Sequence, residues 1–76
     1  MATDICVRVG RRIREIRKQR GWRQIDLAEQ AGIGKNHISE VERGQRELGL
    51  RNLEAIAKSL NVTPCDLLRP VPKPPF

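Results

Sequence analysis

The apolar positions of the chain follow helical spacing along most of its length. The first group consists of Ile5, Val9, Ile13 and Ile16, which recur at intervals of four, four and three residues and therefore share one face of a helix. Gly21 follows a basic last turn, and a glycine at this place is typical of a helix end in the left-handed conformation. The pattern predicts a first helix that ends near Gly21.

Three more helices are predicted in the middle of the chain, where no alternating pattern indicates a strand. Gly32 ends the second helix, and Gly44 follows the third. The apolar faces would be formed by Leu27, Ala28 and Ala31, then by Ile38 and Val41, and then by Leu53, Ile56, Ala57 and Leu60. We therefore expect an all-α fold.

The segment that starts at Thr63 predicts a short fifth helix. Thr63 is suited to cap this helix, Pro64 to occupy its first position and Asp66 to complete a capping box. Leu67 and Leu68 give the helix apolar side chains to bury.

Beyond this helix, four prolines in residues 70–75 exclude a helix and favour an extended polyproline conformation. Pro72 and Pro75 also satisfy the PxxP pattern of docking peptides, although a disordered tail explains the same composition. We predict one domain in residues 1–69 and a proline-rich C-terminal tail in residues 70–76.

The charge of the chain points to an anionic partner. The formal net charge is +6, and residues 8–23 contain eight basic residues against one acidic residue, Glu15. Nucleic acid, an acidic membrane surface and an acidic protein all fit such a segment, and so does a solvated basic helix without a partner. Charge alone does not choose among them.

Neither a cofactor nor a membrane span is expected. Cys6 and Cys65 lie at opposite ends of the chain, which has one histidine, so the spacing of a metal site is missing. We interpret both cysteines as reduced residues of a cytosolic protein. No apolar run is long enough to cross a membrane, and the first residues lack the regions of a signal peptide, which predicts a cytoplasmic location.

Two of the predicted helices are separated by a turn of only three residues around Gly32. Such a turn makes the helices cross steeply, which requires a small residue at the crossing and a left-handed backbone in the turn. Ala28 and Gly32 meet these two requirements. The apolar residues that would lock the pair onto the core are Ile33, Ile38 and Val41.

The chain resembles the Cro and phage-repressor helix-turn-helix family, also called the xenobiotic-response-element family, over about residues 8–69. The matching motifs are residues 24–32, 38–44, 53–57 and 60–62. Residues 38–53 are also similar to the controller proteins of restriction–modification systems. The resemblance implies a five-helix, lambda-repressor-like domain that binds double-stranded DNA to regulate transcription, with its third helix in the major groove.

The resemblance also implies DNA contacts. Gln24 would bind a phosphate at the start of the second helix, where free amides and the helix dipole favour an anion. Lys35 would donate to guanine and Asn36 would pair with adenine or bind a phosphate, while Glu40 would accept from cytosine or repel phosphate in a wrong register. The exposed positions expected in the recognition helix are Lys35, Asn36, His37, Ser39 and Glu40.

Three arginines outside this helix are further candidates for DNA contacts. Arg43 and Arg46 lie in the following loop, which the family places against the DNA backbone, so we predict phosphate or minor-groove contacts. A solvated surface arginine is the alternative for each of them. Arg23 is a further candidate for a phosphate contact.

Other residues are better explained by structure. The family often has a buried arginine–glutamate pair between its first helix and the end of its third, and Arg17 and Glu42 match those positions. We interpret Trp22, just before the second helix, as a core residue. The chain departs from the family at Gly34 and Gly49, where Ser or Thr usually caps the third and fourth helices.

We expect a homodimer, because one recognition helix reads few base pairs and the family places two such helices about 34 Å apart. The C-terminal part would form the interface, although its apolar residues could equally close the monomer core. These residues are Leu60, Val62, Leu67, Leu68 and Val71. Because no domain is left to sense a small-molecule ligand, regulation would follow the monomer–dimer equilibrium.

The predicted function is a transcriptional regulator that binds a short palindromic operator and could regulate its own gene. An antitoxin-type protein that binds a partner protein as well as DNA is the alternative. An enzyme is not expected, since the sequence has no nucleophile–base pair and no phosphate-binding glycine loop. A binder of membranes or acidic proteins is disfavoured because Arg14 and Arg17 flank a stripe that the core needs.

Overall fold

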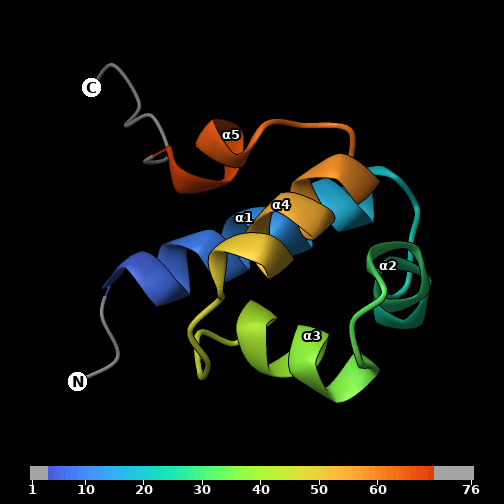
Figure 1. The fold of residues 1–76 in the computed structure, drawn as a ribbon, viewed down its shortest axis with the longest axis horizontal. Coiled ribbons are helices and arrows are strands. Elements are labelled where there is room, and N and C mark those ends of the chain that lie inside the picture. Colours follow the sequence, from blue (N-terminus) through green and yellow to red (C-terminus); the bar gives the residue numbers. More distant parts are fainter. Residues whose placement is uncertain (1–3, 70–76) are drawn as a thin grey trace.

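The computed structural model describes residues 4–69. Its helices are α1 (Asp4–Gln19), α2 (Gln24–Ala31), α3 (Lys35–Glu42), α4 (Leu50–Ser59) and α5 (Pro64–Leu68) (Figure 1). No strand occurs within residues 4–69, so the prediction of an all-α fold with five helices is confirmed. The predicted proline-rich tail, with Val71, Pro72 and Pro75, lies outside the described residues.

The glycines that were predicted to end helices have a left-handed backbone. The φ angle is +73° at Gly21 and +69° at Gly32, a region in which a side chain with a Cβ is strained. The backbone N–H of Gly32 donates to the carbonyl of Ala28 and so satisfies one of the last carbonyl groups of α2. These turns allow short, steep connections between neighbouring helices.

α5 begins with the predicted capping box. The backbone N–H of Asp66 donates to Thr63 Oγ1 (3.2 Å), and the backbone N–H of Thr63 donates to Asp66 Oδ2 (3.0 Å). The bond from the Thr63 backbone N–H is the main reason why the pKa of Asp66 lies below its ordinary value. The capping box thus starts a helix of only five residues.

The apolar faces of the helices form one core. Its fully buried large side chains are Ile13, Leu27, Ile38, Ile56, Leu60 and Leu67. Trp22 is half-buried and packs against this core, as predicted. Ile5 belongs to the apolar stripe of α1 but is 45% exposed, because it lies at the rim of an open pocket.

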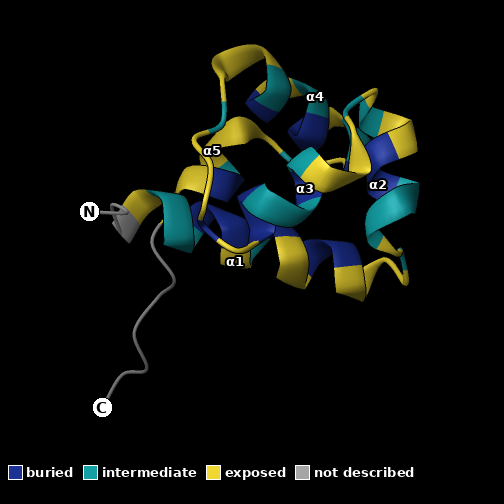
Figure 2. Ribbon diagram, turned by 90° about the horizontal axis from the view of Figure 1, so that it is seen from below, coloured by how far each residue is buried: buried dark blue, intermediate teal, exposed yellow. Residues whose placement is uncertain are grey.

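α2 and α3 lie on one side of α1 and α4, and α5 lies on the other side (Figure 1). α1 packs on α3 and α5, while α4 packs on α2 and α5. The crossing of α1 and α3 is close at Gly10, where an added Cβ would approach the carbonyl oxygens of Val41 and Glu42. Seen from below, α2 and α3 present exposed positions to the viewer (Figure 2).

Candidate nucleic-acid interface

α2 and α3 form the predicted helix-turn-helix unit. In the turn between them, the backbone N–H of Ile33 donates to the carbonyl of Ala28 (3.0 Å). Ala28 is buried, and Ile38 and Val41 hold α3 in the core. The small, left-handed and apolar residues predicted for this motif therefore occupy the expected places.

α3 presents a polar face to the outside. It buries Ile38 and Val41, and with about 3.6 residues per turn the opposite side carries Asn36 and Glu40, continued by Arg43 at the C-cap. These three residues are spaced by four and three positions, so they form one row along the helix. Such a row is what a helix in a major groove offers to the edges of the bases.

The other predicted contact residues of α3 flank this row. Lys35 is exposed and Ser39 is half-buried. His37 is also half-buried, and its Nε2 is enclosed without a hydrogen-bond partner among residues 4–69. His37 thus turns part of its ring toward the protein, which leaves less of it to face a partner than the sequence indicates.

α3 and α4 begin without side-chain caps. Gly34 and Gly49 occupy the N-cap positions and have an extended backbone, in agreement with the departure from the family pattern. The first amide groups of α3 therefore have no side-chain partner. These amides carry partial positive charge and suit an anion such as a phosphate.

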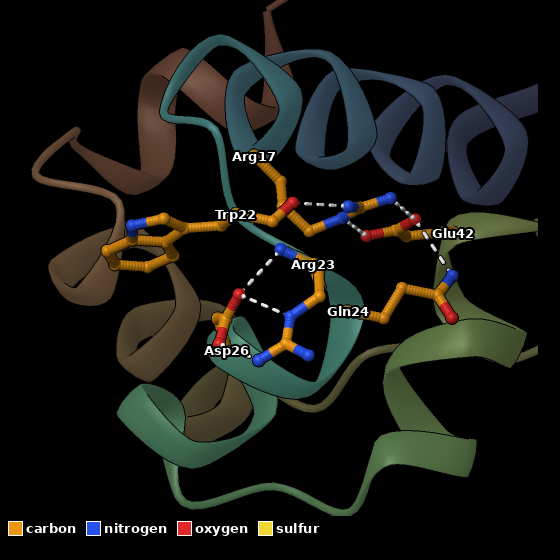
Figure 3. Close-up of polar contacts among 6 residues, drawn as sticks. All are labelled: Arg17, Trp22, Arg23, Gln24, Asp26 and Glu42. Carbon is orange, nitrogen blue, oxygen red and sulfur yellow. Dashed lines mark hydrogen bonds and ion pairs between the residues drawn. The ribbon is translucent and has the colours of Figure 1, made fainter.

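A buried ion pair holds the end of α3 against α1. Arg17 Nε and Nη2 donate to Glu42 Oε2 and Oε1 at 2.7 and 3.0 Å, and Arg17 Nη1 donates to the carbonyl of Trp22 at 2.7 Å (Figure 3). Both charged residues are less than one-tenth exposed. The predicted structural role of this pair is confirmed, and the pair also fixes the segment that leads into α2.

Gln24 belongs to the same network. Its Nε2 donates to Glu42 Oε1 (3.1 Å), so one of its two amide hydrogens is used inside the protein (Figure 3). The second hydrogen is available to a phosphate at the N-terminus of α2. The sequence predicts the phosphate contact but not the bond to Glu42, because residues eighteen apart in sequence give no signal of their proximity.

Arg23 precedes α2 and pairs with Asp26 of its first turn. Arg23 Nη2 lies 3.2 Å from Asp26 Oδ1, and the backbone N–H of Arg23 donates to Asp26 Oδ2 at 2.8 Å. The side-chain hydrogen bond from Arg23, followed by the backbone one, lowers the pKa of Asp26. A phosphate at Arg23 would have to compete with this carboxylate.

The loop after α3 brings Arg46 back to the outward row. Arg46 Nη1 lies 2.8 Å from Glu40 Oε1, and both side chains are about half exposed. Arg43 is exposed, and its side chain has no hydrogen-bond or ion-pair partner in the described part of the chain. Sequence reasoning missed the Glu40–Arg46 pair because the path of a loop decides whether such residues meet.

Residues 4–69 contain no cluster of three His, Cys, Asp or Glu side chains that could hold a metal ion. None of the helices in this range has the length and apolar character needed to cross a membrane.

The arrangement matches a known family of proteins. A family model described as Helix-turn-helix matches residues 13–67. The chain belongs to the helix-turn-helix family. This helix-turn-helix family, of the xenobiotic-response-element type, comprises DNA-binding regulators of transcription, which confirms the resemblance seen in the sequence.

Several helix-turn-helix proteins are similar to the chain. The control protein C.BamHI of Bacillus amyloliquefaciens is 38% identical over 69 residues, which cover 90% of this chain and 85% of that protein. The regulator SinR of Bacillus subtilis is 36% identical over 61 residues, which cover 79% of this chain and 55% of SinR. The solved structure of the restriction–modification controller protein C.AhdI from Aeromonas hydrophila superimposes with a TM-score of 0.80 at 37% identity, covering 82% of this chain and 94% of that one.

Proposed function

We propose that this chain regulates transcription by binding a short palindromic operator as a homodimer, with α3 in the major groove. The outward row of α3 carries this proposal, because Asn36, Glu40 and Arg43 stand on a helix that the buried Arg17–Glu42 pair holds from behind. Side chains that read bases must be held in a fixed register, and a buried bidentate pair supports such a register.

In this proposal, base recognition belongs to the first part of α3. Lys35 donates to guanine O6 and N7, and Asn36 pairs with adenine or binds a phosphate. Glu40 accepts from cytosine N4 or excludes wrong sequences, with Ser39 and His37 at the edges of the contact. Each good base contact would discriminate between sequences by about 1–3 kcal/mol.

The proposed phosphate contacts surround these residues. Gln24 offers its second amide hydrogen, and Arg43 is unpaired in the described residues. Arg23 and Arg46 are held by carboxylates in the free protein, so each would exchange its carboxylate for a phosphate on binding. When Arg46 leaves Glu40 for a phosphate, Glu40 needs a base as its new partner. Random DNA does not offer this base, so binding to random DNA is weaker.

The proposed dimer uses the exposed apolar residues at the C-terminal end of the domain. Leu60 and Leu67 are buried in the monomer, whereas Leu68 is 39% exposed. Leu68 and Ile5 line an open, largely apolar pocket of about 300 Å³ together with Leu48 and Leu53. A second copy that covers this pocket would remove Leu68 and Ile5 from water, which favours association.

The similarity to two restriction–modification control proteins over most of their length supports a regulator of that class. We extend the proposal to control of the chain's own gene, which follows protein concentration through the monomer–dimer equilibrium. The division into a domain of residues 1–69 and a tail is part of the same proposal.

The test is a fluorescence-anisotropy titration of the protein with its own upstream DNA and with a scrambled duplex, at several salt concentrations. We expect the upstream DNA to bind at least about a hundredfold more tightly, with two protomers per site and a steep salt dependence. Lys35→Ala should reduce this preference, while Lys58→Ala on α4 should not. Equal affinity of wild-type protein for both duplexes, and for duplexes selected from a random pool, would contradict the proposal.

An antitoxin-like role, in which the chain also binds a partner protein, is a second candidate. It is supported by the similarity of this chain to a solved complex of the SinR and SinI proteins, with a TM-score of 0.76 at 34% identity over 79% of this chain and 59% of that one. Co-purification of a protein encoded next to this chain, lost on deletion of residues 70–76, would favour this role.

A further inference from the structure

Seven of the eight basic residues in residues 8–23 separate into two sets once the fold is known; the eighth, Arg8, is half-buried and belongs to neither. Four arginines hydrogen-bond within the domain: Arg12 and Arg20 to the carbonyls of Asp66 and Leu60, Arg17 to Glu42, and Arg23 to Asp26. Arg11, Arg14 and Lys18 are exposed, and their side chains have no hydrogen-bond or ion-pair partner among residues 4–69. We call these three residues the basic stripe of α1, because spacings of three and four residues place them on one face of the helix.

Contacts of α1 show which way the stripe faces. An added Cβ at Gly44, in the loop after α3, would lie within 3.0 Å of Val7, and Gly10 meets the last turn of α3. Val7 stands four and seven residues before Arg11 and Arg14, so all three share one flank of α1. The stripe therefore lies on the exposed face of α1, on the flank next to the end of α3 and the loop that follows it.

The opposite flank of α1 is engaged by α5. Arg12 reaches the carbonyl of Asp66 there, at 3.3 Å. The stripe is thus separated from the C-terminal end of the domain and adjoins the recognition unit. Arg43, the last residue of the outward row, follows directly after the crossing of α1 and α3.

We propose that the basic stripe of α1 binds the phosphate backbone of DNA beyond the base pairs read by α3. This inference rests on the proposed function, because it extends the same DNA interface. Three unpaired cations beside a helix-turn-helix unit complement the charge of a duplex backbone, and each phosphate contact releases condensed counterions. Exposed positions of α1 run alongside α3 in the view from below (Figure 2). Glu15 is the exposed acidic residue next to the stripe and leaves its net charge positive.

The test compares two operator duplexes, one that ends at the outer edges of the half-sites and one extended by about ten base pairs, or one helical turn, on each side. The operator is first selected from a random pool with wild-type protein. The variant Arg14→Gln/Lys18→Gln removes two charges of the stripe. Lys58→Gln/Arg69→Gln is the control for total charge, since it removes one lysine and one arginine from exposed positions on α4 and after α5; Arg69, unlike the stripe residues, also lies 3.4 Å from Asp66 Oδ1.

We expect wild-type protein and the control to bind the extended duplex more tightly than the trimmed one. The stripe variant should lose this gain, and its slope of log affinity against log salt should be shallower by about 2 per protomer. Unfolding midpoints followed by Trp22 fluorescence confirm that both variants are folded. No gain from extension in wild-type protein, or equal losses in both variants, would overturn the inference. Failure of the proposed function would show separately, as equal binding to operator and scrambled duplexes.

Discussion

At the scale of single residues, Arg17 connects three segments of the chain. Its guanidinium group bonds both oxygens of Glu42 and the carbonyl of Trp22, so α1, the end of α3 and the entrance to α2 meet at one side chain. Both charges are buried. A buried charge that keeps its partner costs little, whereas one that loses its partner is strongly destabilising.

We therefore predict that Arg17→Met lowers the free energy of unfolding by about 3–5 kcal/mol, because it leaves the carboxylate of Glu42 buried without a cation, with only the amide of Gln24 as a donor. Urea unfolding followed by Trp22 fluorescence measures this loss. Arg14→Met on the exposed face of α1 is the control and should change stability by about 0.5 kcal/mol or less. The double variant Arg17→Met/Glu42→Leu should recover most of the loss, and a double variant as unstable as Arg17→Met would contradict this explanation.

At the scale of helices, the crossing of α1 and α3 depends on a residue without a side chain. A Cβ at Gly10 would lie 2.9 Å from the carbonyl oxygen of Glu42 and closer still to that of Val41. Both obstacles are backbone atoms, so relief requires that the two helices move apart. This movement would also stretch the Arg17–Glu42 pair, which spans the same interface.

Gly10→Ala is expected to destabilise the domain by about 1–3 kcal/mol, although alanine is the better helix former by about 1 kcal/mol. Thermal and urea unfolding would both report the change. Gly49→Ala is the comparison without a steric clash, because a Cβ at Gly49 meets nothing within 4 Å and any loss there comes from alanine being the poorer N-cap residue. Increased stability of Gly10→Ala would show that α1 and α3 pack less closely than described.

At the scale of the whole molecule, we propose one surface for DNA binding and another for dimerisation. The outward row of α3 and the basic stripe of α1 belong to one surface, and the open pocket with Ile5 and Leu68 lies on α1, α5 and the loop after α3, where Arg46 lines the pocket and also pairs with Glu40 of the row. Dimerisation through this pocket would leave the proposed DNA contacts on the outward side of α3 exposed in both copies.

We predict that Leu68→Glu shifts the monomer–dimer equilibrium toward the monomer by at least about tenfold, because a charge replaces an apolar side chain that the dimer would bury. Sedimentation velocity over a range of protein concentrations measures the shift, and circular dichroism verifies the fold. Gln19→Glu adds the same charge at an exposed position of α1 and should leave the equilibrium unchanged. Equal dimerisation of both variants would place the interface elsewhere.

Much of the fold could be predicted because its signals are local. The spacing of Val9, Ile13 and Ile16 and the glycine ends of α1 and α2 describe contacts within a few residues of each other. The roles of polar residues were harder to predict from the sequence, because they depend on contacts between distant segments. The exposed side chain of Leu68 and the buried one of Leu67 are adjacent in sequence, and only the packing of α5 distinguishes them.

The sequence by itself determined the helices, their ends, the helix-turn-helix unit and its family, since periodicity, caps and left-handed glycines act over one or two turns. Only the tertiary structure decided which basic side chains are not held by hydrogen bonds within the protein. Arg11 and Arg12 are neighbours in sequence, yet Arg12 is held by α5 and Arg11 is exposed without a partner in the described residues. The physical reason is that a hydrogen bond requires atoms within about 3 Å, and the packing of the helices determines which distant residues come that close.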